Sequence, residues 1–194
     1  INYASQLAAL RGLVNRYKPG IALWQGENGA PSAPNGTGAL STLDWNEAAQ
    51  AKWLTRRLVL DLAAGIEVTS YFLIVDIVNY VALKATGKTN FKGVLRGTDY
   101  TPKPSFAALQ HVCRLFDAET KRADLMVEFG DAARAATLTS ATFVRQGKPL
   151  IAYWQPAALP AGAGELAPVD LKVWAGSKLT LERPVAVDLL SGDI

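Results

Sequence analysis

The chain has 194 residues, of which 49% are hydrophobic, so it is long and apolar enough to bury a domain-sized core, which excludes an intrinsically disordered protein. Its 20 Lys and Arg against 17 Asp and Glu leave a formal charge of +3. The basic residues are scattered rather than gathered into a patch, as on an ordinary solvated surface. We therefore expect no nucleic-acid partner.

The chain has one cysteine and one histidine, which limits its disulfide and metal chemistry. The one cysteine, Cys113, excludes an internal disulfide, and its place in an apolar helical pattern predicts a buried structural thiol. With one histidine, His111, the chain lacks the side chains that zinc prefers. We expect no metal and no other cofactor.

The longest apolar stretch, 66–83, contains Glu67, Asp76 and Asn79, whose burial in lipid would be costly. We expect a buried strand and a loop there, and no membrane partner. The sequence shows no basic segment followed by an apolar run at its start, so no export signal is visible. The location of the protein in the cell stays open.

The first half of the chain alternates between helical and strand patterns. Apolar residues form one helical stripe over 3–17, and Pro19-Gly20 ends this helix. The short apolar run 21–25 is typical of a buried strand. A loop rich in Gly, Pro, Ser and Asn follows over 28–42.

A second helix is predicted to begin at Asp44, because Asp44 and Glu47 have the spacing of a capping box. The β-branched and aromatic run 68–75 predicts a second strand, 84–99 a second loop, and Pro104 opens a third helix. Strands that alternate with helices in this way imply a parallel sheet with right-handed crossovers.

The second part of the chain has a different pattern. Four short β-type runs separated by turn residues predict an antiparallel β-domain, which we expect to be a small sandwich. The runs cover 138–144, 150–154, 171–174 and 184–190. We therefore divide the chain into an α/β part, 1–117, and a β part, 118–194.

Two acidic residues occupy the ends of the predicted strands, where functional groups of parallel βα structures gather. Glu27 follows the first strand, and Asp76 ends the second. Alternation along the strand puts Gln25 and Glu27 on one face, which directs Glu27 to the mouth of a barrel. The flanking glycines admit close approach of a sugar, on which Trp24 can stack. A strand-end glutamate paired with an arginine is the alternative.

Three ordered groups of segments carry a resemblance to a known group of enzymes. Together they resemble glycoside hydrolases of clan A, most closely family 39 and related bacterial barrel enzymes. The resemblance covers about residues 1–116. The segments are WQGENG at 24–29; QAKWLTRR at 50–57 leading to GIE at 65–67 and Asp76; and FKGVLR at 91–96 with YTPKPSF at 100–106.

The resemblance implies a fold and a set of roles. Residues 1–117 are expected to form the last two βα units of a (β/α)8 barrel, and a β-sandwich is expected to follow. Glu27 matches the nucleophile of a retaining glycosidase. Asp76, Trp24 and Asn28 are expected to contact a carbohydrate substrate.

The chain departs from the family at the second catalytic carboxyl group. In clan A the acid/base follows the fourth strand, usually as Asn-Glu, and this chain matches the barrel only from its sixth helix. The pair Asn46-Glu47 resembles that motif, but it lies behind a capping aspartate and is expected to cap a helix. The resemblance therefore implies an enzyme that is incomplete or weakly active as this chain alone.

Two strands cannot close a barrel, and their edges would stay exposed. We therefore expect a homo-oligomer or a complementing chain. Two other functions remain open: a carbohydrate-binding module, and a non-catalytic structural fragment. For the first, Tyr153, Trp154 and Trp174 are candidates for a stacking platform on the β-domain, although aromatic residues of a small sandwich commonly belong to its core.

Overall fold

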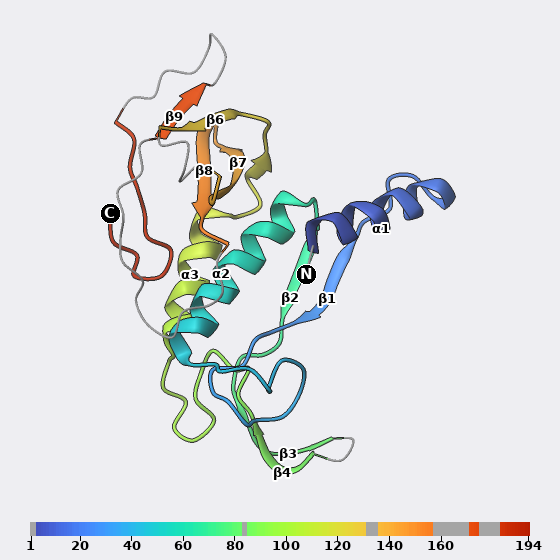
Figure 1. Ribbon diagram of the computed structural model, residues 1–194, viewed down its shortest axis with the longest axis vertical. Helices are drawn as coiled ribbons and strands as arrows, with labels where there is room; N and C mark the ends of the chain where they lie inside the picture. The colour runs from blue at the N-terminus through green and yellow to red at the C-terminus, as the bar shows by residue number, and fades with distance from the viewer. Residues whose placement is uncertain (1–2, 83–84, 131–135, 157–170, 175–182) are drawn as a thin grey trace.

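The computed structural model of the chain describes residues 3–82, 85–130, 136–156, 171–174 and 183–194. In Figure 1, β1 and β2 run side by side between α1 and α2, α3 lies beside α2, the β3–β4 hairpin projects at one end, and the remaining strands gather at the other. The elements of the described ranges are α1 (Tyr3–Tyr17), β1 (Trp24–Asn28), α2 (Glu47–Ala63), β2 (Val68–Tyr71), β3 (Ile77–Ala82), β4 (Ala85–Asn90), α3 (Pro104–Leu115), β5 (Thr120–Arg122), β6 (Met126–Phe129), β7 (Thr139–Arg145), β8 (Lys148–Trp154) and β9 (Leu171–Trp174).

The two strands predicted to be parallel do pair in parallel. Trp24 of β1 lies opposite Val68 of β2, and Gln25 lies opposite Thr69. This confirms the parallel βαβ arrangement, although β1 begins three residues later than 21 and β2 ends at Tyr71 rather than at 75. Within the described ranges this sheet has two strands and is not closed. Its place in a (β/α)8 barrel stays a prediction.

Helix α2 begins later than the capping-box pattern predicted. Asn46, not Asp44, is the N-cap: its side chain accepts a hydrogen bond from the backbone N–H of Ala49 at 2.8 Å. Glu47 then lies in the first turn, where its carboxylate accepts two hydrogen bonds from Arg96 at 3.0 and 2.6 Å. The prediction that Asn46-Glu47 begins a helix is confirmed, and Glu47 also holds the segment before α3 against α2.

A buried carboxylate on α2 ties three elements together. Asp61 is fully buried and accepts hydrogen bonds from Tyr3 of α1, from Arg57 one turn earlier, and from Thr69 of β2. The Arg57 guanidinium also lies 3.8 Å from the centre of the Tyr3 ring. Such a charge is tolerated in the interior because every partner donates to it.

The segment after β2 differs from the predicted loop at 84–99. Strands β3 and β4 form an antiparallel hairpin, with Ile77 opposite Asn90 and Tyr80 opposite Lys88. The sequence hid this hairpin because β4 reads ATGKTN, a run of small and polar residues without the usual β-branched pattern. The loop 28–42 lies against it, since Thr37 donates its backbone N–H to the Thr89 carbonyl at 3.1 Å.

The β-rich part is antiparallel, as predicted. β5, β7 and β8 form one sheet, and β6 pairs with β9. The run 184–190 is not a strand. Phe143 of β7 is fully buried and forms a core cluster with Ala152 of β8 and Val59 of α2, so the sheet packs against the helical part. A sandwich and the boundary at 117 stay predictions.

The prediction of a buried Cys113 is wrong, because this residue is exposed. The buried positions of α3 are Ser105, Ala108 and Val112, which follow one stripe at helical spacing. Cys113 follows Val112 by one residue, which turns its side chain about 100° away from that stripe.

An ion pair joins the end of α3 to the β-sheet and predicts a pH dependence. Arg145 donates two hydrogen bonds to Asp117, at 3.1 and 2.6 Å, and these bonds lower the pKa of the Asp117 carboxyl. A carboxyl group with a lowered folded-state pKa adds stability above its unfolded pKa, about 3.9, and that stability is lost as pH falls through the folded value.

We therefore expect Asp117→Asn to lower the urea midpoint at pH 5.5, with the gap from wild type closing as the pH falls below about 3.9. Urea denaturation of both proteins across this range measures the gap. Asp124→Asn is the control. This aspartate is 93% exposed, and its ion pair with Arg122 is long, at 3.6 Å, so it should contribute little to stability. A gap that stays constant down to acid pH would contradict the ion-pair account.

Candidate functional site

An irregularity at the end of β1 decides which way Glu27 faces. Gln25 pairs with Thr69, but the next pair is Asn28 with Tyr71, so β1 holds one residue more than β2 between these points. Thr69 donates to Asp61 of α2, and directly paired residues point to the same side of a sheet. Gln25 and Asn28 therefore lie on the α2 side, and Glu27 points to the opposite, open side.

Glu27 is exposed at this open face, whereas Asn28 is only 8% exposed. Trp24, on the same face as Glu27, is 70% exposed. The Glu27 carboxylate makes no hydrogen bond or ion pair within the part of the chain that the structure describes, and Gln25 donates only to its backbone carbonyl, at 3.0 Å. The face shared by Gln25 and Glu27, expected from simple alternation, is not observed.

A buried lysine lies near Glu27 and was not singled out from the sequence. Lys92 is 7% exposed, and its aliphatic stem runs past Gly29 and Gly38, whose added Cβ atoms would lie 3.5 and 3.6 Å from it. Burial lowers the pKa of Lys92, and the negative charge of Glu27 raises it in part. A lysine within the apolar run that includes Phe91 and Val94 was the signal that could have identified it.

This electrostatic contact predicts the effect of removing one charge. In Glu27→Gln, we expect the pKa of Lys92 to fall further, because only burial would then act on it. Titration of the Lys92 side-chain NMR signals measures the change. Glu128→Gln, an exposed carboxylate on β6, is the control. An unchanged Lys92 titration in Glu27→Gln would show that the two charges do not interact.

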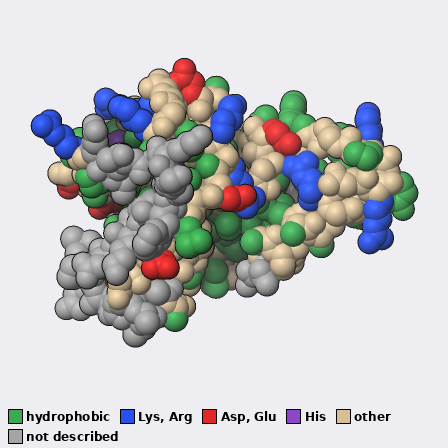
Figure 2. Space-filling model, turned by 90° about the horizontal axis from the view of Figure 1, so that it is seen from above, with side chains coloured by type: hydrophobic (Ala, Val, Ile, Leu, Met, Phe, Trp, Pro, Cys, Tyr) green, Lys and Arg blue, Asp and Glu red, His purple; other side chains and the backbone are tan. Residues whose placement is uncertain are grey.

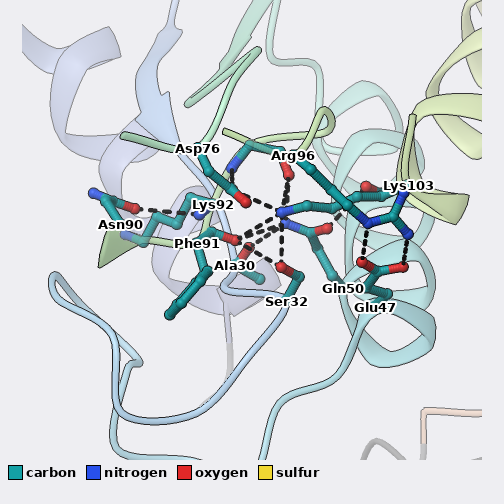
Figure 3. A network of polar contacts seen from close by, with 12 residues as sticks. Ala30, Ser32, Glu47, Gln50, Asp76, Asn90, Phe91, Lys92, Arg96 and Lys103 are labelled. Atoms are coloured by element: carbon teal, nitrogen blue, oxygen red, sulfur yellow. Dashed lines mark hydrogen bonds and ion pairs between the residues drawn. The ribbon is translucent and has the colours of Figure 1, made fainter. Parts of the chain in front are cut away.

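Asp76 is buried and held by the protein itself. Its carboxylate accepts hydrogen bonds from the Lys103 ammonium at 2.7 Å and from the backbone N–H of Gly93 at 2.8 Å (Figure 3). Lys103 also donates to the Ser32 hydroxyl at 2.7 Å and to the Gly93 carbonyl at 2.9 Å. Through Lys103, Asp76 therefore joins the loop after β1 to the segment after β4.

The Gln50 side chain of α2 holds the loop after β1 and the segment after β4 together. The Gln50 side chain is fully buried, and its Nε2 donates to the carbonyl groups of Ala30, Phe91 and Gly93 (Figure 3). Its Oε1 accepts a hydrogen bond from Ser105 at 2.8 Å. One amide thereby connects the loop after Glu27, the segment after the hairpin, and helix α3.

Asn28 donates its Nδ2 to the Ser70 carbonyl at 3.1 Å, and its Oδ1 is buried without a partner. In the β-rich part of the chain, Tyr153 is 44% exposed and packs edge-on against Phe129. Trp154 packs against the core cluster of α2 and the sheet. The side chain of Trp174, the third aromatic of the predicted platform, lies outside the described residues.

Among the residues described, no group of three His, Cys, Asp or Glu side chains converges as for a metal ion. None of the described helices combines the length and the apolar character needed to cross a bilayer.

Comparisons with known proteins gave matches only among solved structures. No family model matches the sequence, and no curated protein matches it significantly. An FMN-binding β-glucuronidase from Facaelibacterium prausnitzii L2-6 shares 16% identity with a TM-score of 0.39, covering 88% of this chain and 29% of that one. Bacteroides uniformis β-glucuronidase 2 shares 15% identity with a TM-score of 0.40, covering 86% of this chain and 24% of that one.

A third protein, from Bacteroides fragilis and described as a β-galactosidase, shares 13% identity with a TM-score of 0.42, covering 88% of this chain and 30% of that one. The chain thus spans less than a third of the length of the three solved proteins that it matches here. These structural neighbours are glycosidases, at low similarity.

Proposed function

We propose that this chain is the nucleophile-bearing part of a retaining glycosidase, with Glu27 as the nucleophile. The observation that carries the proposal is the free, exposed carboxylate of Glu27 at the carboxyl end of a parallel strand. The carboxylates of Glu47, Asp61, Glu67 and Asp76 are each held by protein groups.

The surroundings of Glu27 suit a sugar substrate. Gly29 has no Cβ, so the backbone next to Glu27 can lie against the Phe72 carbonyl group. The exposed Trp24 ring offers a flat apolar surface for a pyranose. The buried amine of Lys92 lies near the carboxylate, and the negative charge of Glu27 raises the lysine pKa in part. Asn28 stays proposed as a substrate contact, and Asp76 is proposed to shape the site through the loops that it holds.

In this mechanism Glu27 attacks the anomeric carbon, the bond to the leaving oxygen breaks, and a glycosyl-enzyme ester forms on Glu27. Water then attacks the same carbon, and the carboxylate leaves with inversion a second time, so configuration is retained. A second carboxyl group about 5 Å away normally protonates the leaving oxygen and later activates the water. We propose that another polypeptide segment supplies it.

The test uses substrates whose leaving group needs no protonation. Incubation with dinitrophenyl 2-deoxy-2-fluoro glycosides of several sugars, glucuronide and galactoside included, should add one glycosyl group to the chain, detected by intact-mass spectrometry. Peptide mapping should place it on Glu27. The adduct should form slowly and persist, since the fluorine and the missing base both slow the second step.

Two variants make the result specific. Glu27→Gln should abolish labelling, and Asp124→Asn, an exposed carboxylate of the β part, should leave it unchanged. Labelling of Glu27→Gln at the wild-type rate would refute the nucleophile role. If no sugar labels the wild type while glycans still bind, the chain is a carbohydrate-binding module.

A further inference from the structure

The part of the chain that the structure describes contains two buried lysines, and they differ in what holds their side-chain nitrogen atoms. Lys103 donates to the Asp76 carboxylate and to the Ser32 hydroxyl. The Nζ atom of Lys92 makes no hydrogen bond or ion pair with any described residue, although this residue is only 7% exposed. In Figure 2, by contrast, the lysine and arginine side chains of the visible face project into solvent. A buried amine without a partner is costly, so this position indicates a ligand.

The tip of the Lys92 side chain can be reached from solvent. Among the described side chains, the only completely sealed nitrogen or oxygen atom without a partner is Asn28 Oδ1. The unbonded Lys92 Nζ atom is therefore not completely sealed. The base of the residue is fixed, because its carbonyl accepts hydrogen bonds from the Tyr71 hydroxyl at 3.1 Å and from the Leu73 N–H at 3.3 Å. Lys92 thus holds a positioned amine behind a small opening.

A second hydrogen-bond donor lies beside this amine. Asn90 is 3% exposed, and its Oδ1 accepts the backbone N–H of Lys92 at 3.2 Å (Figure 3). Its Nδ2 makes no hydrogen bond with a described residue. A Cβ added at Gly38 would lie 3.6 Å from Asn90 Nδ2 and 3.6 Å from Lys92 Nζ, so both nitrogen atoms border the same space. A carbonyl group in this space would accept a hydrogen bond from the amide and present its carbon to the amine.

The surroundings of Lys92 also suit a reaction of its amine. Burial lowers the pKa of Lys92, and the negative charge of Glu27 raises it in part. A lower pKa increases the fraction of neutral amine, which is the nucleophilic form. A protonated imine, the product of amine and aldehyde, is positively charged, so the Glu27 carboxylate favours it. The same carboxylate can accept a hydrogen bond from a hydroxyl group of the ligand, which favours a hydroxyaldehyde over an apolar aldehyde.

We propose that Lys92 is a covalent, reversible capture site for hydroxyaldehydes, a class that includes short free aldehydes and the open-chain form of reducing sugars, with Asn90 donating to the carbonyl oxygen. The Lys92 nitrogen attacks the aldehyde carbon, and one amine proton passes through solvent to the carbonyl oxygen, which becomes a hydroxyl group. This hydroxyl group then leaves as water with a proton from solvent, and a protonated C=N bond joins Lys92 to the ligand. The step needs no oxidant or reductant, and it does not depend on Glu27 being a nucleophile.

The probe is glycolaldehyde, used on the full chain at about pH 6.5 with cyanoborohydride, which reduces the imine to a stable secondary amine. At limiting reagent, peptide mapping by mass spectrometry should find Lys92 labelled at least about fivefold more than the exposed Lys88. A second arm replaces glycolaldehyde with xylose, and methyl xyloside, which has no aldehyde form, is its control. Labelling of Lys92 by xylose assigns the site to reducing sugars, and labelling by glycolaldehyde alone assigns it to short aldehydes.

Variants of the chain complete the test. Asn90→Asp keeps the acceptor for the Lys92 N–H but removes the amide donor and adds a negative charge, so Lys92 labelling should slow about tenfold. Lys88→Met should leave it unchanged. Glu27→Gln should still be labelled at Lys92 while it loses the glycosyl label, which separates this inference from the proposed function. Two results would overturn the capture site: Lys92 labelled no more than Lys88 in the wild type, or an unchanged rate in folded Asn90→Asp.

Discussion

Lys103→Met is expected to destabilise the protein by about 3–5 kcal/mol, because it leaves the Asp76 carboxylate buried without its counter-charge. The two side chains are 1% and 6% exposed, and their charged atoms are 2.7 Å apart. Burial lowers the pKa of Lys103, and the Asp76 carboxylate raises it. Each buried charge therefore depends on the presence of the other. Urea denaturation followed by circular dichroism measures the loss, a large fraction of the stability of a typical domain.

The partner variant distinguishes a stranded charge from lost packing. Asp76→Asn combined with Lys103→Met should be less destabilised than Lys103→Met alone, because the amide has no charge to desolvate. Lys88→Met on the exposed hairpin is the matched control and should change stability by less than about 0.5 kcal/mol. Equal losses in the single and the double variant would contradict the ion-pair explanation.

Gly29→Ala has the second large expected effect, on stability and on the site. A Cβ at Gly29 would lie 1.9 Å from the Phe72 carbonyl oxygen and 3.0 Å from its carbon, both backbone atoms that cannot rotate away. The loop after Glu27 must then move away from β2. We expect a loss at or above the upper end of the roughly 1–3 kcal/mol typical of overpacking, together with loss of Glu27 labelling.

The control for this substitution lies three residues earlier. A Cβ at Gly26 would meet nothing within 4 Å. Gly26→Ala should therefore change the free energy of unfolding by less than about 0.5 kcal/mol and preserve labelling. Urea denaturation and the intact-mass assay measure both effects. Similar results for the two alanine variants would show that the tight contact at Gly29 is absent in solution.

The strands and helices could be predicted where apolar periodicity is strong. The β1–β2 pair, α3 and the antiparallel β-part follow from such patterns. The start of α2 could not be settled, because Asp44 and Asn46 are both good capping residues and only the fold selects Asn46. The β3–β4 hairpin could not be predicted, because β4 lacks side chains that favour strands.

The candidate site was predictable in part. The position of Glu27 at the end of a strand follows from the sequence, and so does an acidic Asp76 after the second strand. The face of Glu27 does not follow, because one extra residue in β1 interrupts the alternation. The burial of Asp76 against Lys103 joins residues 27 positions apart, a contact that no local pattern encodes.

The Gln50 amide has a mechanical consequence. The fully buried Gln50 side chain bonds Ala30, Phe91 and Gly93 at once. The loop that follows β1 and the segment that follows the β3–β4 hairpin are therefore coupled, because the same amide group holds both. A ligand that displaces either one must displace both or break these bonds. If the proposed function holds, adaptation of the site to different sugars is therefore expected at the exposed tips of these segments, with their bases fixed.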